Sequence, residues 1–274
     1  MQVRAGQVGA TLVLLVGVAS AQAPVARQAP TGPAEEAPPE YPAVSVDRPV
    51  LLLDGITTVD LAGELEHVPA GALDLADAAS TVAHTRTTPG LALAHSFGNV
   101  QIGVFGTRYA AGASVAVQSS TVPSGSVVLA VQDLAVGEGG GYDYTESVSY
   151  DYKRVVAPHR FAFSMAFGAN IAELKVTLPN RVTTAGHIAA IAVTAAAEVQ
   201  ITGRLSLALG AGVDSVVDHS KALPSDQYLA AGATVRFATP RFDLYGDLAF
   251  PDVTHATTVA AAVGVLCRFG LQGR

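Results

Sequence analysis

The sequence predicts an all-β protein, an antiparallel transmembrane β-barrel of about 12 strands, with about 10 or 8 as the alternatives. The first observation behind this prediction is composition. The 274 residues are 50% hydrophobic and only 14% charged, with a mean hydropathy of +0.37. After the first twenty or so residues, however, no apolar run reaches the roughly 18 positions that a membrane helix needs. A closed barrel is the other structure that satisfies its backbone in lipid.

The second observation is a strict alternation of apolar and polar residues between residues 227 and 269. In the middle segment of this region, Phe242, Leu244 and Leu248 alternate with Asp243 and Asp247. A period of two over about ten residues, repeated between turns, is typical of strands with two different faces. Charged residues at mid-strand favour lipid on one side and a wet or salt-bridged lumen on the other. A soluble, Ala-rich β-sandwich is the alternative.

The N-terminal part divides into two segments before the barrel. Residues 1–23 are expected to be a cleaved export signal, with Arg4, a short apolar core and the small-x-small pattern Ala21-Gln22-Ala23. Residues 24–49 contain seven prolines and three glutamates, which predicts a disordered periplasmic linker. It is interpreted either as a plain leader or as a tether to a partner. The barrel is expected over residues 50–274.

The remaining strands are expected in chain order. A hairpin should turn at Gly98-Asn99, and Thr239-Pro240 should form a short periplasmic turn. The parity of the apolar face slips near Ala169-Asn170, which predicts a turn there. Long connections at 68–89 and 217–226 are expected outside the cell, and the region 109–156 is hard to register. The expected strands are 58–66, 91–97, 100–108, 126–134, 160–167, 172–178, 187–199, 203–216, 227–237, 241–250 and 258–269.

The last strand carries a recognisable motif. Gly264, Cys267 and Phe269 occupy the glycine, hydrophobic and aromatic positions of polar-x-Gly-x-x-hydrophobic-x-aromatic, although Ala262 replaces the polar residue and five residues follow Phe269. This strand resembles the C-terminal assembly signal of bacterial outer-membrane β-barrel proteins. The resemblance implies a Gram-negative outer-membrane location, contact with outer-membrane lipid, and recognition by the barrel-assembly machinery.

Catalytic, metal and cofactor sites are not predicted. His95 and Ser96 are adjacent, so they point to opposite faces of a strand and cannot form a local nucleophile–base pair. His255 and Asp252 share a turn, which is commonplace. The seven histidines lack the spacing of metal ligands. A net charge of −7 also argues against nucleic acid as a partner.

The predicted lumen is the more informative feature. Its expected charges have both signs, so cross-strand pairs such as Arg236 or Arg268 with Asp243 or Asp247 can brace the wall. The other inward positions are mostly small, which leaves water-filled space in a wall of ten or twelve strands. We therefore expect a narrow passive pore for small solutes; a structural or interaction barrel is the alternative, and an outer-membrane hydrolase is less favoured. The predicted inward charges are Asp60, Glu64, Arg160, Glu173, Lys175, Glu198, Arg204, Asp214, Arg236, Asp243, Asp247 and Arg268.

Overall fold

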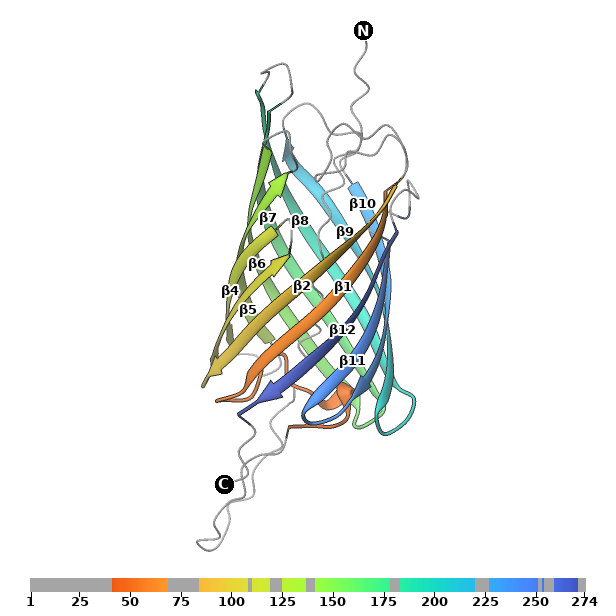
Figure 1. Ribbon diagram of the computed structural model, residues 1–274. Coiled ribbons are helices and arrows are strands. Elements are labelled where there is room, and N and C mark those ends of the chain that lie inside the picture. The colour runs from red at the N-terminus through yellow and green to blue at the C-terminus, as the bar shows by residue number, and fades with distance from the viewer. Residues whose placement is uncertain are drawn as a thin grey trace, which may run out of the picture.

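The strands in the described part of the protein form one antiparallel sheet that closes on itself (Figure 1). The computed structural model describes residues 41–68, 84–107, 110–118, 125–136, 141–177, 183–219, 227–250, 253 and 259–270. Each strand pairs with its neighbours in the chain, and the first strand also pairs with the last, from Thr57 opposite Phe269 to His67 opposite Val259. The all-β antiparallel prediction is confirmed. The alternative of a two-sheet sandwich is wrong, because the strands that the structure describes all lie in the same closed sheet.

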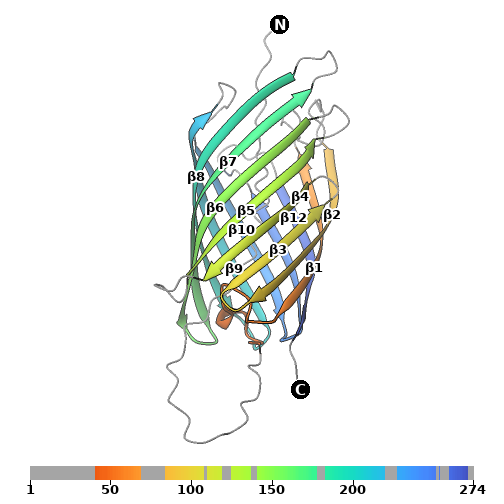
Figure 2. The same ribbon diagram turned by 90° about the vertical axis from the view of Figure 1, so that its left-hand side faces the viewer.

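The strands follow a simple up-and-down order around the barrel (Figures 1 and 2). They are β1 (Thr57–Val68), β2 (His84–Phe97), β3 (Val100–Thr107), β4 (Ala110–Gln118), β5 (Gly125–Val136), β6 (Gly141–Ala157), β7 (Phe161–Thr177), β8 (Thr183–Gln200), β9 (Leu205–His219), β10 (Gln227–Ala238), β11 (Phe242–Phe250) and β12 (Val259–Phe269). A single 3-10 turn, η1 (Ser45–Asp47), precedes them in the described part of the chain.

The outer surface of the barrel is apolar. Large aliphatic and aromatic side chains stand exposed along the strands, including Leu61 at 57%, Phe97 at 58% and Val263 at 68%. A contiguous apolar belt of this kind is unusual on a soluble protein and is the normal exterior of a barrel in lipid. No helix in the described ranges is long and apolar enough to cross a membrane.

The inner face has the opposite character and does not form a hydrophobic core. Its positions are occupied mostly by Ala, Gly, Ser and Thr, with charged side chains between them. Among the described buried residues, the apolar cluster consists only of Val50, Leu51 and Ala116. The alternation that predicts each strand therefore separates an apolar exterior from an inner face of small or polar side chains.

The two ends of the barrel differ. At one end, called here the short-turn end, lie the start of β1, the end of β12 and the tight connections 98–99, 158–160, 201–204 and 239–241. Gly98 has a φ of +59°, as the predicted two-residue hairpin requires. Thr239 also forms the predicted turn, where its Oγ1 accepts a hydrogen bond of 2.9 Å from the Phe242 N–H. Apart from Val253, the connections at the other end, called here the far end, lie outside the described residues.

The predicted strand boundaries need correction in several places, and one is that β9 runs to His219, into the connection expected at 217–226. β7 runs without interruption through Ala169 and Asn170, in register with both β6 and β8, so the turn expected there is wrong. β2 begins at His84 and includes Pro89, which shortens the predicted connection 68–89. β4 and β6 occupy the region that could not be registered.

The length of the strands explains the slip in parity. β6, β7 and β8 have 17, 17 and 18 residues, whereas about 9–11 tilted residues cross a bilayer. Figure 2 shows β7 and β8 reaching beyond the neighbouring strands at the far end, so their additional length projects there. Residues beyond the lipid are not required to keep an apolar outer face, and the alternation ends there.

The segment before β1 is the main departure from the sequence prediction. Residues 41–53, called here the N-terminal plug, lie at the mouth of the short-turn end (orange in Figure 1). Tyr41 is 4% exposed, Val46 is fully buried and Arg48 is 1% exposed. The expectation of a solvated linker up to Pro49 is therefore wrong for residues 41–49. Residues 1–40 lie outside the described residues.

Candidate functional site

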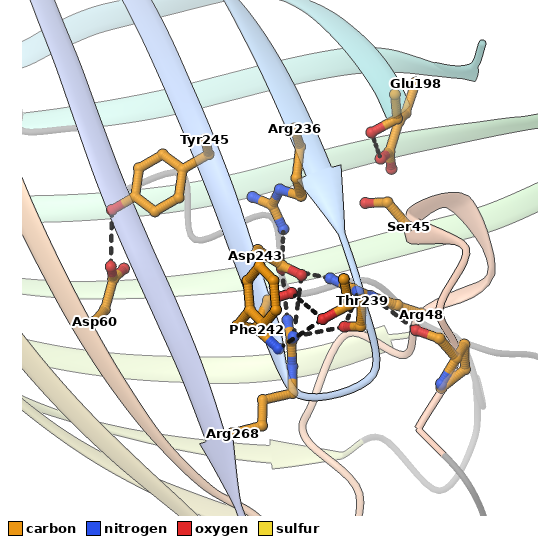
Figure 3. Close-up of polar contacts among 12 residues, drawn as sticks. Ser45, Arg48, Asp60, Glu198, Arg236, Thr239, Phe242, Asp243, Tyr245 and Arg268 are labelled. Atoms are coloured by element: carbon orange, nitrogen blue, oxygen red, sulfur yellow. Dashed lines mark hydrogen bonds and ion pairs between the residues drawn. The ribbon is translucent and has the colours of Figure 1, made fainter. Parts of the chain in front are cut away.

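The plug is attached to the barrel wall through a cluster of three arginines around one carboxylate (Figure 3). Asp243 of β11 is fully buried and accepts hydrogen bonds from Arg268 of β12, at 3.0 Å from Nη1 to Oδ1 and 2.6 Å from Nη2 to Oδ2. Arg48 of the plug donates Nη1 to the same carboxylate. Arg236 of β10 lies 3.7 Å from Asp243 Oδ2. Arg48 also donates to the Thr239 carbonyl at 3.0 Å, so the plug is linked to the β10–β11 turn as well.

Tyr41 completes this cluster from the plug side. The guanidinium of Arg268 lies 4.5 Å from the centre of its ring, and that of Arg48 lies 5.3 Å away. Guanidinium groups at this distance are attracted by the aromatic face, and more strongly when water is excluded. Burial lowers the pKa of Arg48, and the carboxylate of Asp243 opposes this effect. An arginine remains charged in such surroundings, so the contact is an ion pair.

A second polar cluster lies on the neighbouring wall. Lys153 of β6 is 1% exposed and donates to Glu198 Oε2 of β8 at 3.1 Å, while Ser206 of β9 donates to Glu198 Oε1 at 3.0 Å. Lys153 also donates to the backbone carbonyl of Ser45 in the plug at 3.2 Å. The wall therefore supplies a complete ion pair, and the plug adds one neutral acceptor.

The remaining plug contacts lie on other sides of the mouth. Asp47 accepts a hydrogen bond from the His159 N–H at 2.9 Å and contacts His159 Nδ1, in the β6–β7 turn. The Leu52 N–H donates to Gln101 Oε1 of β3 at 3.0 Å, and Ser96 of β2 donates to the Leu52 carbonyl at 3.0 Å. The plug thus touches β2, β3, β6 and β11, which lie around the whole circumference, and it crosses the opening.

A separate contact spans the seam where the barrel closes. Tyr245 of β11 reaches across β12 and donates its hydroxyl to Asp60 Oδ1 of β1 at 2.9 Å (Figure 3). Its ring passes directly over Gly264, where a β-carbon would lie 2.7 Å from Tyr245 Cε1. A side chain at position 264 would occupy the place of the ring. Gly264 therefore allows the last two strands to be fastened to the first.

The predicted lumen residues fall into two groups. Arg236, Asp243 and Arg268 meet on the adjacent strands β10, β11 and β12. Asp60 of β1 accepts the hydrogen bond from Tyr245 across β12, and Asp247 follows Asp243 and Tyr245 on the same face. Glu64 and Asp214 are half-buried and share the inward parity of their strands. Glu198, also expected inward, is 6% exposed in the cluster with Lys153.

Two of the predicted lumen charges are placed wrongly by the sequence. Arg160 and Arg204 are exposed residues of the β6–β7 and β8–β9 turns, because β7 begins at Phe161 and β9 at Leu205. Of the motif residues in the last strand, Cys267 is half-buried and Phe269 is 55% exposed on the outer face. The side chains of Glu173 and Lys175 lie outside the described part of the structure.

The sequence analysis missed the plug residues Tyr41 and Arg48 and the inward Lys153. A signal for the first two exists, since residues 50–53 are Val-Leu-Leu-Leu, an apolar run without alternation at the end of a proline-rich segment. Lys153 lies in β6, whose register could not be assigned from sequence.

The residues considered for catalysis remain unsupported as a site. The Nδ1 atom of His95 lies 2.7 Å from Thr57 Oγ1. Ser96 is fully buried on the opposite face and donates to the Leu52 carbonyl, so the two residues do not form a pair. His255 and Asp252 lie outside the described residues. Within the described ranges, no group of three or more His, Cys, Asp or Glu side chains is placed to hold a metal ion.

Comparison with known proteins identifies the fold. A scan against protein-family models finds no match, and a search of curated proteins finds none of similar sequence. Among solved structures, the NanC porin matches with a TM-score of 0.51 and 9% identity, over 76% of this chain and 98% of that chain. An outer membrane channel from Pseudomonas putida F1 matches with a TM-score of 0.54 and 11% identity, over 86% and 100%.

A third match is the translocator domain of the autotransporter NalP from Neisseria meningitidis, with a TM-score of 0.52 and 10% identity, over 79% of this chain and 90% of that chain. At these identities the likeness concerns the fold. The fold is that of small, porin-like outer-membrane β-barrels, as the resemblance of the last strand implies.

Proposed function

We propose that the protein is an outer-membrane barrel that acts as a narrow passive pore for small solutes. The observation that supports it best is the combination of an apolar exterior with a wall of small inward residues. Strands spaced by about 4.8 Å and tilted by about 40° give a twelve-stranded ring roughly 24 Å across between backbone centres. Side chains fill an eight-stranded barrel, and a wider ring lined by Ala, Gly, Ser and Thr leaves room for water.

The charges on the wall give the lumen its character. The described inward cations Arg236, Arg268 and Lys153 lie in the clusters at the short-turn end. Further along the lumen, the described inward charges include the carboxylates of Asp60 and Asp247. The matched structures described as a porin and as an outer membrane channel support a pore, and they leave the solute undefined.

The location and assembly of the barrel form part of the same proposal. Residues 1–23 direct export, and Gly264, Cys267 and Phe269 at the end of β12 are read by the barrel-assembly machinery. The exposed belt then contacts outer-membrane lipid. We assign no enzymatic step to the barrel wall or to the plug.

Single-channel recording on purified, folded protein in a planar bilayer tests the pore. We expect discrete conductance steps under a salt gradient, with the heat-denatured protein as the control. Folded protein that inserts and gives no step at any voltage or salt concentration, with and without the plug, contradicts the proposed function.

A structural or interaction barrel is the second candidate, and the plug favours it. The plug crosses the mouth, and the charged groups that it contacts are paired. Such a barrel would use its proline-rich leader to hold a partner. Deletion of residues 24–40 should then abolish recovery of a bound protein in a pull-down experiment, while heat-modifiable gel mobility shows an intact barrel.

A further inference from the structure

The plug can leave the mouth without stranding charges in the wall. Asp243 keeps both hydrogen bonds from Arg268 and the nearby Arg236 when Arg48 is withdrawn. Lys153 likewise keeps Glu198. Loss of one partner from a buried ion pair is strongly unfavourable because a charge remains uncompensated. In this wall every such pair is complete before the plug is added, so release exposes no lone buried charge.

The plug's own charged groups move into water when it is released. Arg48 is held by Asp243 on one side of the mouth, and the neighbouring Asp47 is held by His159 on another, in the β6–β7 turn. β11 and β6 are separated around the ring by β7 to β10. The adjacent residues Asp47 and Arg48 therefore connect two distant parts of the rim. The side chain of His159 is 76% exposed, so the contact between Asp47 and His159 is already reached by solvent.

The chain also contains a pivot for this movement. Ile56 is fixed to β2, since its carbonyl accepts the Ser96 N–H at 3.0 Å, and the Gly55 N–H donates to the Ser96 carbonyl at 2.9 Å. Immediately before them the chain leaves the line of β1 and turns into the mouth. Gly55 has a φ of +75°, and nothing lies within 4 Å of the position where its β-carbon would be. Asp54 and Gly55 are exposed, and the bend is held by a few hydrogen bonds: the Gly55 N–H to Ser96, the Ile56 N–H to the Leu53 carbonyl at 3.2 Å, and the Gly98 N–H to the Asp54 side chain. Rotation of the backbone on the plug side of Gly55 has to break some of these bonds, and a glycine then tolerates the new backbone angles.

We propose that the N-terminal plug is a gate: docked through Asp47 and Arg48 it closes the short-turn end of the lumen, and by swinging about Gly55 it opens it. This inference rests on the proposed pore function. A fixed structural plug would supply a charge that the wall lacks. Here the buried ion pairs of the wall are complete without the plug, and the plug only adds contacts to them.

Paired measurements of conductance and labelling test the gate in full-length protein reconstituted in lipid. The release variant carries Asp47→Ala and Arg48→Ala, and a shortened variant lacks residues 41–52. Arg204→Ala is the matched control, because it removes a charge from an exposed turn at the same rim. We expect an open probability or conductance several-fold above wild type in the release and shortened variants, and no change in the control. Heat-modifiable gel mobility establishes that each variant is folded.

The labelling measurement does not depend on conductance. Ser45 is fully buried in the docked plug, so Ser45→Cys in a Cys267→Ala background should react slowly with a membrane-impermeant maleimide. Adding Asp47→Ala and Arg48→Ala should accelerate the reaction at least tenfold. Equal conductance and equal labelling in all folded variants would overturn the gate and leave the pore intact. Faster labelling without any conductance, even in the shortened variant, would show that the plug moves but that the proposed pore is wrong, and the gate with it.

Discussion

Replacement of Gly264 by alanine should disrupt the closure of the barrel although it adds only one methyl group. The added β-carbon would lie 2.7 Å from Tyr245 Cε1, well inside contact distance. The neighbouring backbone is held in register by β11 and β1, so the ring has to move instead. The ring cannot move without losing the 2.9 Å hydrogen bond from its hydroxyl to Asp60.

The size of the effect follows from these two changes. A hydrogen bond to a charged group is worth about 1.5–3 kcal/mol. Forcing an extra methyl into a packed position costs about 1–3 kcal/mol. Together they predict that Gly264→Ala lowers the free energy of unfolding by about 2.5–6 kcal/mol. Tyr245→Phe should lose only the hydrogen bond. Gly246→Ala is the matched control, because the nearest atom to its added carbon is 3.9 Å away.

Urea unfolding in lipid vesicles, followed by tyrosine fluorescence and heat-modifiable gel mobility, measures the change. The double variant Gly264→Ala with Tyr245→Ala separates packing from the proposed assembly signal. If packing is the cause, the alanine at 264 should have almost no further effect once the ring is gone. An equal loss with and without the ring would refute this reasoning, as would a wild-type unfolding midpoint for Gly264→Ala alone.

Three further predictions concern the wall. Lys153→Met or Glu198→Gln alone should destabilise the barrel by about 3–5 kcal/mol in the same urea assay, because each leaves one buried charge unpaired. The double variant should recover most of this loss, and single variants of wild-type stability would contradict the prediction. Asp60→Asn with Asp247→Asn should reduce the preference of the pore for cations, read as a smaller reversal potential in a KCl gradient; an unchanged potential contradicts an acidic lumen. Leu61→Arg should lower the stability in vesicles by about 2–4 kcal/mol if this 57% exposed residue faces lipid, and an unaltered midpoint contradicts it.

The alternation along β10 to β12 predicts those strands because most outward residues are apolar and the large aliphatic and Phe side chains are concentrated there, whereas most inward residues are small, charged or Tyr. Both predicted hairpin turns also follow from local chemistry. β4 could not be found in this way, since its sequence AAGASVAVQ has small residues on both faces and offers little contrast. β6 begins with Gly-Tyr-Asp-Tyr-Thr-Glu, where the strand extends beyond the length needed to cross lipid.

The site was predicted only in part, for a different reason. Pairing of Arg268 and Arg236 with Asp243 follows from their positions on adjacent strands. The contribution of Arg48 depends on two segments 195 residues apart in sequence meeting at the same mouth, and periodicity within one strand carries no information about that. Prolines in the leader indicated the absence of regular structure, but a segment without regular structure can still be buried.

The central claim is that each strand has one side in hydrocarbon and the other in water. Cysteine scanning of β12 in a Cys267→Ala background, with a water-soluble maleimide on vesicle-embedded protein, tests it most directly. Val263 is 68% exposed but is expected to face lipid, so Val263→Cys should remain unlabelled while Ala262→Cys, facing the lumen, is labelled. Rapid labelling of Val263→Cys, at or above the rate at Ala262→Cys, would contradict the account.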